Sequence, residues 1–273
     1  MLDAVLSLAM TGLVFGALLA YAAKKFAVPL DPRLDQITKE LPGTNCGACG
    51  YASCAALADS IASGSAAPDA CNVGGGEVAR KIAGIMGVSV EDKESQVARV
   101  MCIGGKQEAK ELFTYQGLSS CRAAVMPQTQ GGPKACNYGC LGLGDCVKAC
   151  SFGAIRMDSN GLPEIIDDKC TTCGNCVGAC PRSIIRLVGR SSTVHVRCSN
   201  KDKGAVARKL CKTACIACKR CEKACEHDAV KVEDKIALID YSKCTNCGAC
   251  ALQCRPKCII DETPEAVTDA VAS

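Results

Sequence analysis

The sequence is poor in aromatic residues and in histidine. Of its 273 residues, none is Trp, 4 are Phe and 5 are Tyr, and only 2 are His. So few aromatic side chains leave the chain poorly equipped to build a large aromatic-rich core. Two histidines exclude His-rich metal sites and most zinc sites that mix Cys with His. Something other than apolar burial must therefore hold much of this chain together.

Nucleotide-binding fingerprints are also missing. The sequence contains neither G-x-G-x-x-G nor G-x-x-x-x-G-K-[ST], the loops that cradle the phosphates of dinucleotides and nucleoside triphosphates. We therefore expect no NAD site and no nucleotide site on this chain. Nucleic acid is not an expected partner either, because the chain has few aromatics and no recognition motif.

Cysteine, by contrast, accounts for 25 residues. An odd number cannot pair fully into intramolecular disulfides. The spacing C-x2-C-x2-C-x3-C, typical of the bacterial ferredoxin run for a [4Fe–4S] cluster, occurs three times. Zinc sites give the third closely spaced cysteine no role, so the spacing favours iron–sulfur clusters and, with them, a reducing compartment. The three runs are Cys170, Cys173, Cys176 and Cys180; Cys215, Cys218, Cys221 and Cys225; and Cys244, Cys247, Cys250 and Cys254.

The cysteine pattern of the C-terminal half is an internal repeat. The group of four that begins at Cys136 recurs 75 residues later from Cys211, and the group that begins at Cys170 recurs 74 residues later from Cys244. Such a repeat predicts two double-cluster ferredoxin-like modules in series. The predicted modules are residues 134–192 and 193–262, with a tail at 263–273.

Local patterns predict the small elements around these cysteines. Alternating, β-branched segments between the cysteine groups predict hairpins, and an alanine-rich segment predicts a short helix. The expected hairpins join 154–157 to 163–167 and 229–232 to 236–240. A strand is expected over 97–102, a short polar helix over 106–112, and an apolar helix over 55–62.

The grouping of ligands follows the ferredoxin pattern, in which the fourth cysteine of each run binds the other cluster of the module. The first run lacks a counterpart of Cys218, so Cys211 stays an alternative to Cys218 as a ligand. The unassigned cysteines, Cys102, Cys121, Cys198, Cys211 and Cys258, are expected to be structural or spare thiols. The predicted groups are Cys136, Cys140, Cys146 and Cys180; Cys150, Cys170, Cys173 and Cys176; Cys215, Cys218, Cys221 and Cys254; and Cys225, Cys244, Cys247 and Cys250.

A separate cysteine group precedes the modules. Cys46, Cys49, Cys54 and Cys71 have the spacing C-x2-C-x4-C-x16-C, which predicts a small helical domain around one [4Fe–4S] cluster. The chain thus has an expected α+β fold with about five clusters. Because every expected ligand is cysteine, electron transfer is favoured over chemistry on a substrate. The helical domain is predicted over 26–90 and a connecting segment over 91–133.

The N-terminus is predicted to be a membrane anchor. Residues 4–23 form an uncharged, mostly apolar run, long enough to span a bilayer as a helix. Lys24 and Lys25 follow at once, and the positive-inside rule places that flank in the cytoplasm. A signal peptide would need a basic segment before the run, where the only charge is Asp3. We expect residues 1–25 to be a single-pass transmembrane helix in the lipid bilayer of the cell (inner) membrane, with the cysteine-rich part on the cytoplasmic side.

Basic residues crowd the start of the second module. Such a patch either neutralises the charge of nearby clusters or steers an acidic electron carrier such as ferredoxin toward the chain. The sequence leaves both interpretations open. The residues are Lys201, Lys203, Arg208, Lys209, Lys212, Lys219, Arg220 and Lys223.

Together these features resemble the B subunits of Rnf complexes, which are membrane-bound, ion-translocating ferredoxin:NAD oxidoreductases. The resemblance covers nearly the whole chain. It implies a subunit that accepts electrons from reduced ferredoxin and passes them to other membrane and peripheral subunits, which reduce NAD and move Na⁺ or H⁺. Ser151 and Arg255 depart from the proline that usually follows a run. The resemblance rests on the anchor, on 41–51 (LPGTNCGACGY) with Cys54 and Cys71, and on 136–146 (CNYGCLGLGDC) followed by 150–155 (CSFGAI).

Two other functions stay open at this stage. A membrane-tethered polyferredoxin could serve a different reductase or hydrogenase, and its partners would tell it apart. A scaffold that stores or delivers clusters would need labile or incomplete ligation, against which twenty well-spaced thiolates argue. The anchor carries no carboxylate after Asp3, so ion conduction is expected to lie in partner subunits.

Overall fold

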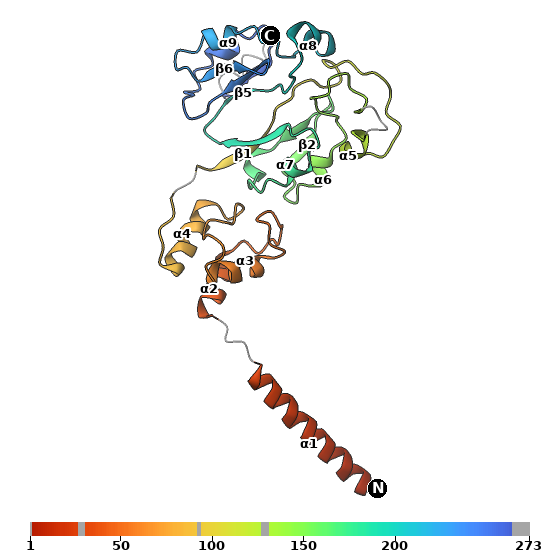
Figure 1. Cartoon of the computed structure of the whole chain (residues 1–273), viewed down its shortest axis with the longest axis vertical. Helices are drawn as coiled ribbons and strands as arrows, with labels where there is room; N and C mark the ends of the chain where they lie inside the picture. The colour runs from red at the N-terminus through yellow and green to blue at the C-terminus, as the bar shows by residue number, and fades with distance from the viewer. Residues whose placement is uncertain (1, 27–30, 92–93, 127–130, 264–273) are drawn as a thin grey trace.

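The computed structural model describes residues 2–26, 31–91, 94–126 and 131–263 (Figure 1). A long N-terminal helix, α1 (Leu2–Lys25), is followed by a small helical domain and then by a larger part of short strands, short helices and loops. This mixture agrees with the predicted α+β class. Within the described residues, no helix combines the length and apolarity that a bilayer span requires, so the predicted transmembrane anchor is not supported here.

The helical domain consists of α2 (Pro32–Glu40), α3 (Cys54–Ala62) and α4 (Gly75–Met86). Local chemistry explains where α2 and α3 start. Asp31 caps α2 by accepting a hydrogen bond from the Arg33 amide at 2.8 Å, and Ser53 caps α3 through the Ala56 amide at 3.1 Å. Helix α3 confirms the helix predicted over 55–62.

The core of this domain is aliphatic. Ile37 of α2, Leu57 and Ile61 of α3, and Ile82 of α4 are all fully buried. Cys49, Cys54 and Cys71 pack against the same cluster. The domain therefore combines a conventional apolar core with a group of cysteines at its edge.

The strands of the larger part form two-stranded antiparallel sheets. The two predicted hairpins are confirmed: β2 pairs with β3 and β6 pairs with β7. Two further pairs join strands far apart in the chain, β1 with β4 and β5 with β8. The strands are β1 (Gln96–Val100), β2 (Ile155–Met157), β3 (Pro163–Ile165), β4 (Ile185–Gly189), β5 (Val194–Val196), β6 (Val230–Glu233), β7 (Ile236–Ile239) and β8 (Ile259–Asp261).

Strand β1 comes from the segment 91–133 and pairs with β4 over its whole length, from Gln96 opposite Gly189 to Val100 opposite Ile185. The strand predicted over 97–102 therefore exists, and it belongs to the sheet of the first module. The short helix predicted over 106–112 does not form. The Lys110 amide donates to the Leu210 carbonyl at 2.8 Å, because pairing with the second module outweighs a weak local helix preference.

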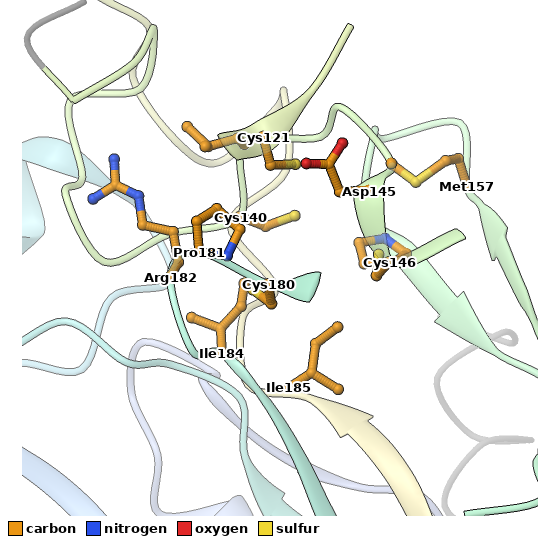
Figure 2. Close-up of a pocket in the computed structure, with 13 residues that line it drawn as sticks. Cys121, Cys140, Asp145, Cys146, Met157, Cys180, Pro181, Arg182, Ile184 and Ile185 are labelled. Atoms are coloured by element: carbon orange, nitrogen blue, oxygen red, sulfur yellow. The ribbon is translucent and has the colours of Figure 1, made fainter. Parts of the chain in front are cut away.

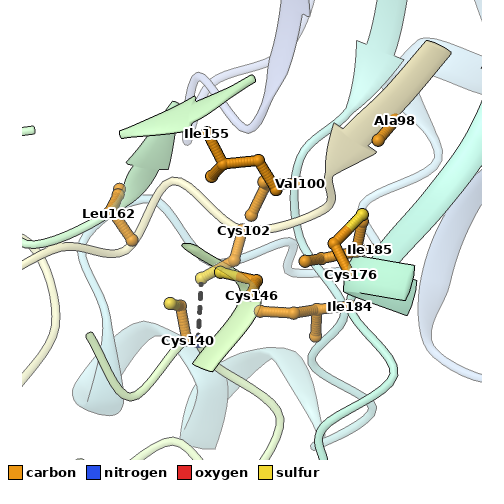
Figure 3. Packing of buried hydrophobic residues seen from close by; sticks show 10 residues of the cluster. All are labelled: Ala98, Val100, Cys102, Cys140, Cys146, Ile155, Leu162, Cys176, Ile184 and Ile185. Atoms are coloured by element: carbon orange, nitrogen blue, oxygen red, sulfur yellow. Dashed lines mark hydrogen bonds between the residues drawn. The ribbon is translucent and has the colours of Figure 1, made fainter. Parts of the chain in front are cut away.

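The helices of this part are only one or two turns long, too short to be stable alone. They are held in a core that mixes aliphatic side chains with cysteines, as Figure 3 shows for Val100, Ile155 and Ile184 around Cys102 and Cys146. The second module has a matching core. The helices are α5 (Cys121–Ala124), α6 (Asp145–Lys148), α7 (Asn175–Ala179), α8 (Gly204–Leu210), α9 (Arg220–Lys223) and α10 (Ala249–Leu252), with a 3-10 turn, η2 (Asp167–Lys169).

An ion-pair network joins the two modules. The Arg99 guanidinium contacts Asp167 at 2.6 Å and, through Nε, Glu262 at 3.0 Å. Glu262 also accepts from Arg197 at 3.0 Å, and Arg197 Nε donates to the Val100 carbonyl at 3.0 Å. The Arg99 side chain is 10% exposed and that of Glu262 is 25% exposed. The Glu262 carboxylate is therefore shared by two largely covered guanidinium groups, those of Arg99 and Arg197.

We expect Glu262→Gln to lower the free energy of unfolding by about 2 kcal/mol, between the cost of losing an exposed pair and a fully buried one. The loss follows because Arg99 and Arg197 would then face each other without their shared carboxylate. Anaerobic denaturant unfolding measures it. Glu164→Gln is the matched control, since its pair with Arg156 is exposed and should cost less than about 1 kcal/mol; equal losses in the two variants would contradict the network.

Candidate iron–sulfur centres

Four short helices each place a cysteine as their second residue. The residue before each helix has a left-handed backbone conformation, which glycine adopts without steric cost. Three of these residues are glycines, and the fourth is Lys219, with φ of 57°. The buried cysteines are Cys146 of α6, Cys176 of α7, Cys221 of α9 and Cys250 of α10.

One cavity of the first module is lined by Cys150, Cys170, Cys173 and Cys176, the four cysteines that the ferredoxin pattern groups together. Burial raises the pKa of Cys176 to about 12, and the charges of Cys173 and Cys170 add to the rise. The Ala154 amide donates to Cys150 Sγ at 3.3 Å. A raised pKa keeps a thiol protonated at neutral pH. Sulfurs crowded in this way are therefore stable as thiolates only when they bind a metal centre.

The second module has a corresponding cavity, lined by Cys215, Cys218, Cys221 and Cys254. Burial raises the pKa of Cys221 to about 12, and the charges of Cys215, Cys254 and Cys218 add to the rise. Of the two alternatives from the sequence, the structure therefore brings Cys218 to this group and not Cys211. Cys258 also lines this cavity.

The remaining group of the second module is also assembled. Burial raises the pKa of Cys250 to about 11, and the next contributions come from Cys244, Cys225 and Cys247. The Ala229 amide donates to Cys225 Sγ at 3.3 Å, in the same way as the Ala154 amide does to its partner in the first module.

Figure 2 shows the other cavity of the first module, where the sulfurs come from three separate stretches of chain. Cys140, Cys146 and Cys180 line it as expected, but the fourth cysteine is Cys121 and not Cys136. Burial raises the pKa of Cys146 to about 11, and the charges of Cys121 and Cys180 contribute next. Cys121 therefore occupies the position in this group that Cys218 has in the second module.

Asp145 fixes Cys121 beside this cavity. Its carboxylate accepts hydrogen bonds from the Ser120 hydroxyl at 2.9 Å and from the Arg122 amide at 3.0 Å. Burial works to raise the pKa of Asp145, but these donors and Lys148 hold it below its usual range. Because Asp145 also opens α6, directly before Cys146, it ties helix α5 to the helix that carries another member of the group.

Cys136 lies in a different cavity, together with Cys102, Cys198 and Cys211. The sequence assigned neither Cys102 nor Cys198 to a cluster, and it gave Cys211 only as an alternative to Cys218. Cys102, Cys136 and Cys211 are buried, and Cys198 is half-buried.

In the helical domain, Cys54 opens α3 and its amide donates to Asn45 Oδ1 at 2.8 Å. Burial raises the pKa of Cys71, and the charges of Cys49 and Cys54 contribute to the rise. These three sulfurs therefore lie near one another. Cys46 stands three residues before Cys49 on the same half-buried loop.

The donor set fits iron–sulfur clusters. All 25 cysteines are free thiols. Among the described residues, no three cysteine, histidine or carboxylate side chains converge closely enough to hold a single metal ion. The sulfurs instead lie around small cavities. This arrangement suits a [4Fe–4S] cluster, in which each of the four iron atoms binds one cysteine.

Family models match both cysteine-rich regions. The model described as "Putative Fe-S cluster" matches residues 41–73, and the "4Fe-4S dicluster domain" matches residues 135–184. The B subunit of the ion-translocating oxidoreductase complex of Methanosarcina acetivorans is 41% identical over 259 residues, covering 95% of this chain and 97% of the relative. The chain belongs to the family of Rnf complex B subunits.

Other Rnf B subunits are similarly close. In Acetobacterium woodii, the B subunit of the Na(+)-translocating ferredoxin:NAD(+) oxidoreductase complex is 48% identical over 91% of this chain and 74% of its own length. The counterpart from the proton-translocating complex of Clostridium ljungdahlii is 43% identical over 90% of this chain and 86% of its own length. The resemblance drawn from the motifs is thus confirmed, and the chain is an electron-transfer subunit with [4Fe–4S] domains.

Sequence reasoning on this Rnf protein missed Cys121, because it stands 19 residues before Cys140, outside any run. A signal was available: the first run lacks a partner for Cys218, which points to a fourth cysteine outside the run. The nearest cysteine upstream of Cys136 is Cys121.

Proposed function

We propose that this chain is the electron-input subunit of an Rnf complex. It accepts electrons from reduced ferredoxin and passes them through its clusters to partner subunits, which reduce NAD and move Na⁺ or H⁺. The succession of four-cysteine groups along one chain carries the proposal, because closely spaced clusters form a path for electrons. The names of the Acetobacterium and Clostridium relatives supply the donor and the acceptor.

The proposed ligands follow the groups described above. When bound, each [4Fe–4S] cluster supplies a one-electron redox centre. The N–H donors to Cys150 and Cys225 favour the reduced cluster, since hydrogen bonds to ligand sulfur raise its potential. The groups are Cys46, Cys49, Cys54 and Cys71; Cys121, Cys140, Cys146 and Cys180; Cys150, Cys170, Cys173 and Cys176; Cys215, Cys218, Cys221 and Cys254; and Cys225, Cys244, Cys247 and Cys250.

The exposed basic residues around α8 and α9 are the proposed dock for ferredoxin. We expect the charge reversals Lys209→Glu, Lys212→Glu and Lys223→Glu together to slow reduction by ferredoxin about tenfold at low salt, because electrostatic steering raises association rates by roughly 10- to 1,000-fold. The measurement is the bleaching of iron–sulfur absorbance of the anaerobic holoprotein after mixing with reduced ferredoxin in a stopped-flow instrument, at low and high salt.

A control for this experiment is the double reversal Lys39→Glu and Lys169→Glu, at exposed lysines away from α8 and α9. It should leave most of the rate and its salt dependence in place. Equal slowing in the two proteins would reject the dock. No bleaching by ferredoxin in the wild type, with clusters that dithionite reduces, would reject ferredoxin as donor.

We also propose that α1 anchors the chain to the membrane as a single-pass helix, with the modules in the cytoplasm. Its 24 residues measure about 36 Å, and Leu13, Phe15 and Leu19 expose at least 66% of their surface. Deleting residues 1–25 is expected to move the chain from carbonate-washed membranes to the soluble fraction. A shortened chain that stays with those membranes, in cells lacking its partner subunits, would contradict this anchor.

A further inference from the structure

The cavity at the junction of the two modules is lined by four cysteines, only one of which the ferredoxin pattern predicts as a ligand. Cys102 and Cys136 come from one side, and Cys198 and Cys211 from the other. Three of them are among the most buried cysteines of the chain. We propose that this cavity binds an additional [4Fe–4S] cluster, with Cys102, Cys136, Cys198 and Cys211 as its ligands.

The four cysteines are two pairs of equivalent positions in the internal repeat. Cys102 stands two residues after β1, and Cys198 stands two residues after β5. Cys136 and Cys211 each stand four residues before the first ligand of the next group. Each module thus contributes the same two positions, one after a strand and one before a cysteine run. Unrelated spare thiols would have no reason to obey the repeat.

The modules meet at this cavity through hydrogen bonds to backbone carbonyls. The Ile103 amide donates to the Arg197 carbonyl at 3.1 Å, and the Ser199 hydroxyl donates to the Met101 carbonyl at 2.9 Å. The residues after β1 therefore lie against those after β5, which brings Cys102 and Cys198 to the same place. Because the first of these bonds joins backbone to backbone, the contact does not depend on side chains alone.

The hydrogen bonds to these sulfurs also follow the repeat. The Cys140 amide donates to Cys102 Sγ at 3.3 Å (Figure 3), and the equivalent Cys215 amide donates to Cys198 Sγ at 3.4 Å. Asn200, which is 1% exposed, donates from Nδ2 to Cys136 Sγ at 3.2 Å. Hydrogen bonds to a charged acceptor are the strong ones, so this pattern of donors suits thiolates, the form in which cysteine binds iron.

Charge and space are also arranged for a cluster. Lys134 is 3% exposed, and its ammonium group donates to the Gly104 carbonyl at 2.6 Å, close to the cavity. A cluster with four thiolates carries a charge of about −2, which this buried cation partly balances. A Cβ atom on Gly104 would lie 2.9 Å from Cys211 Sγ and 3.9 Å from Cys102 Sγ, so glycine leaves room for both sulfurs.

The position of the proposed cluster gives it a role, which rests on the proposed function of the chain. Cys136 and Cys140 are four residues apart and face different cavities, and the same holds for Cys211 and Cys215. The cluster therefore lies between one group of the first module and one of the second. One electron passes from a reduced neighbour to the oxidised cluster and on to the next, with no bond made or broken and no proton moved.

Native mass spectrometry of the anaerobically reconstituted full-length chain tests the site. We expect the heaviest species of the wild type to carry six [4Fe–4S] clusters, about 24 iron atoms, and the Cys102→Ala/Cys198→Ala variant to carry five. Ser192→Ala is the control, because it also removes one atom from a buried side chain but Ser192 lines none of the cysteine cavities described above; it should retain six. A wild type that stops at five clusters would overturn the proposal, even if the double variant failed to fold.

The result is independent of the donor. Six clusters with no reduction by ferredoxin would leave the site in place and reject the proposed function. Five clusters that ferredoxin reduces would reject the additional site and leave the proposed function in place. A double variant that still carries six clusters would also overturn the site.

Discussion

Removing the clusters is expected to unfold both ferredoxin-like modules while the helical domain keeps much of its structure. The modules have strands of three to five residues and helices of four to seven, which are not stable alone. Their cores each contain four buried cysteines beside five large aliphatic residues. Metal binding in small structural sites contributes about 10 kcal/mol or more to folding, so its loss is comparable to the whole stability of a typical domain.

Hydrogen exchange measured by mass spectrometry after anaerobic chelation tests this expectation. Peptides from residues 94–126 and 131–263 should lose their protection, whereas peptides from α2 and α4 should keep most of it. The reason is the fully buried aliphatic core of Ile37, Leu57, Ile61 and Ile82. Rebuilding the clusters should restore protection. Modules that remain protected without iron would show that side-chain packing alone holds them.

Replacing Cys121 and Cys136 is expected to remove two different clusters. Each single change to alanine should lower the iron content by about four atoms per chain, and the double change by about eight. The physical reason is the separation of the two side chains into different cavities, one with Cys146 and Cys180 and the other with Cys198 and Cys211.

Iron and acid-labile sulfide of the purified, anaerobically reconstituted variants provide the measurement. If Cys121 and Cys136 contributed to the same cluster, the double variant would lose no more iron than either single variant. If Cys121 were a spare thiol, its replacement would leave the iron content unchanged. Ser192→Ala serves again as the control for a one-atom deletion at a buried position.

Much of the fold could be predicted because its elements are local. The hairpins β2/β3 and β6/β7 follow from alternation over a few residues, and α3 from an alanine-rich segment. The left-handed residue before three of the four short helices that carry a cysteine as their second residue is also encoded locally, by Gly144, Gly174 and Gly248. The pairing of β1 with β4 was beyond such reasoning, because nothing in residues 96–100 specifies a partner so distant in the chain.

The same limit applies to the candidate centres. Spacing grouped Cys170, Cys173 and Cys176 with Cys150, and the structure brings these four together. Spacing grouped Cys136 with Cys140, Cys146 and Cys180, whereas Cys136 lines a different cavity; the repeat was read only from Cys136 onward. Between Cys102 and Cys136 lie 21 residues more than between Cys198 and Cys211, and this insertion, which contains Cys121, hid the equivalence of the upstream cysteines.

The pairing of β1 with β4 also constrains how a cell can make this protein. Ile185 leaves the ribosome 85 residues after its partner Val100, a delay of roughly 4–17 s at ordinary rates of synthesis. During that time Cys102 and Cys121 have emerged while Cys180 has not. The helical domain, whose cysteines end at Cys71, can be loaded early. The first module can receive iron only after Cys180 has emerged and the second only after Cys254, so the machinery that delivers clusters must act on the second module when the chain is almost finished.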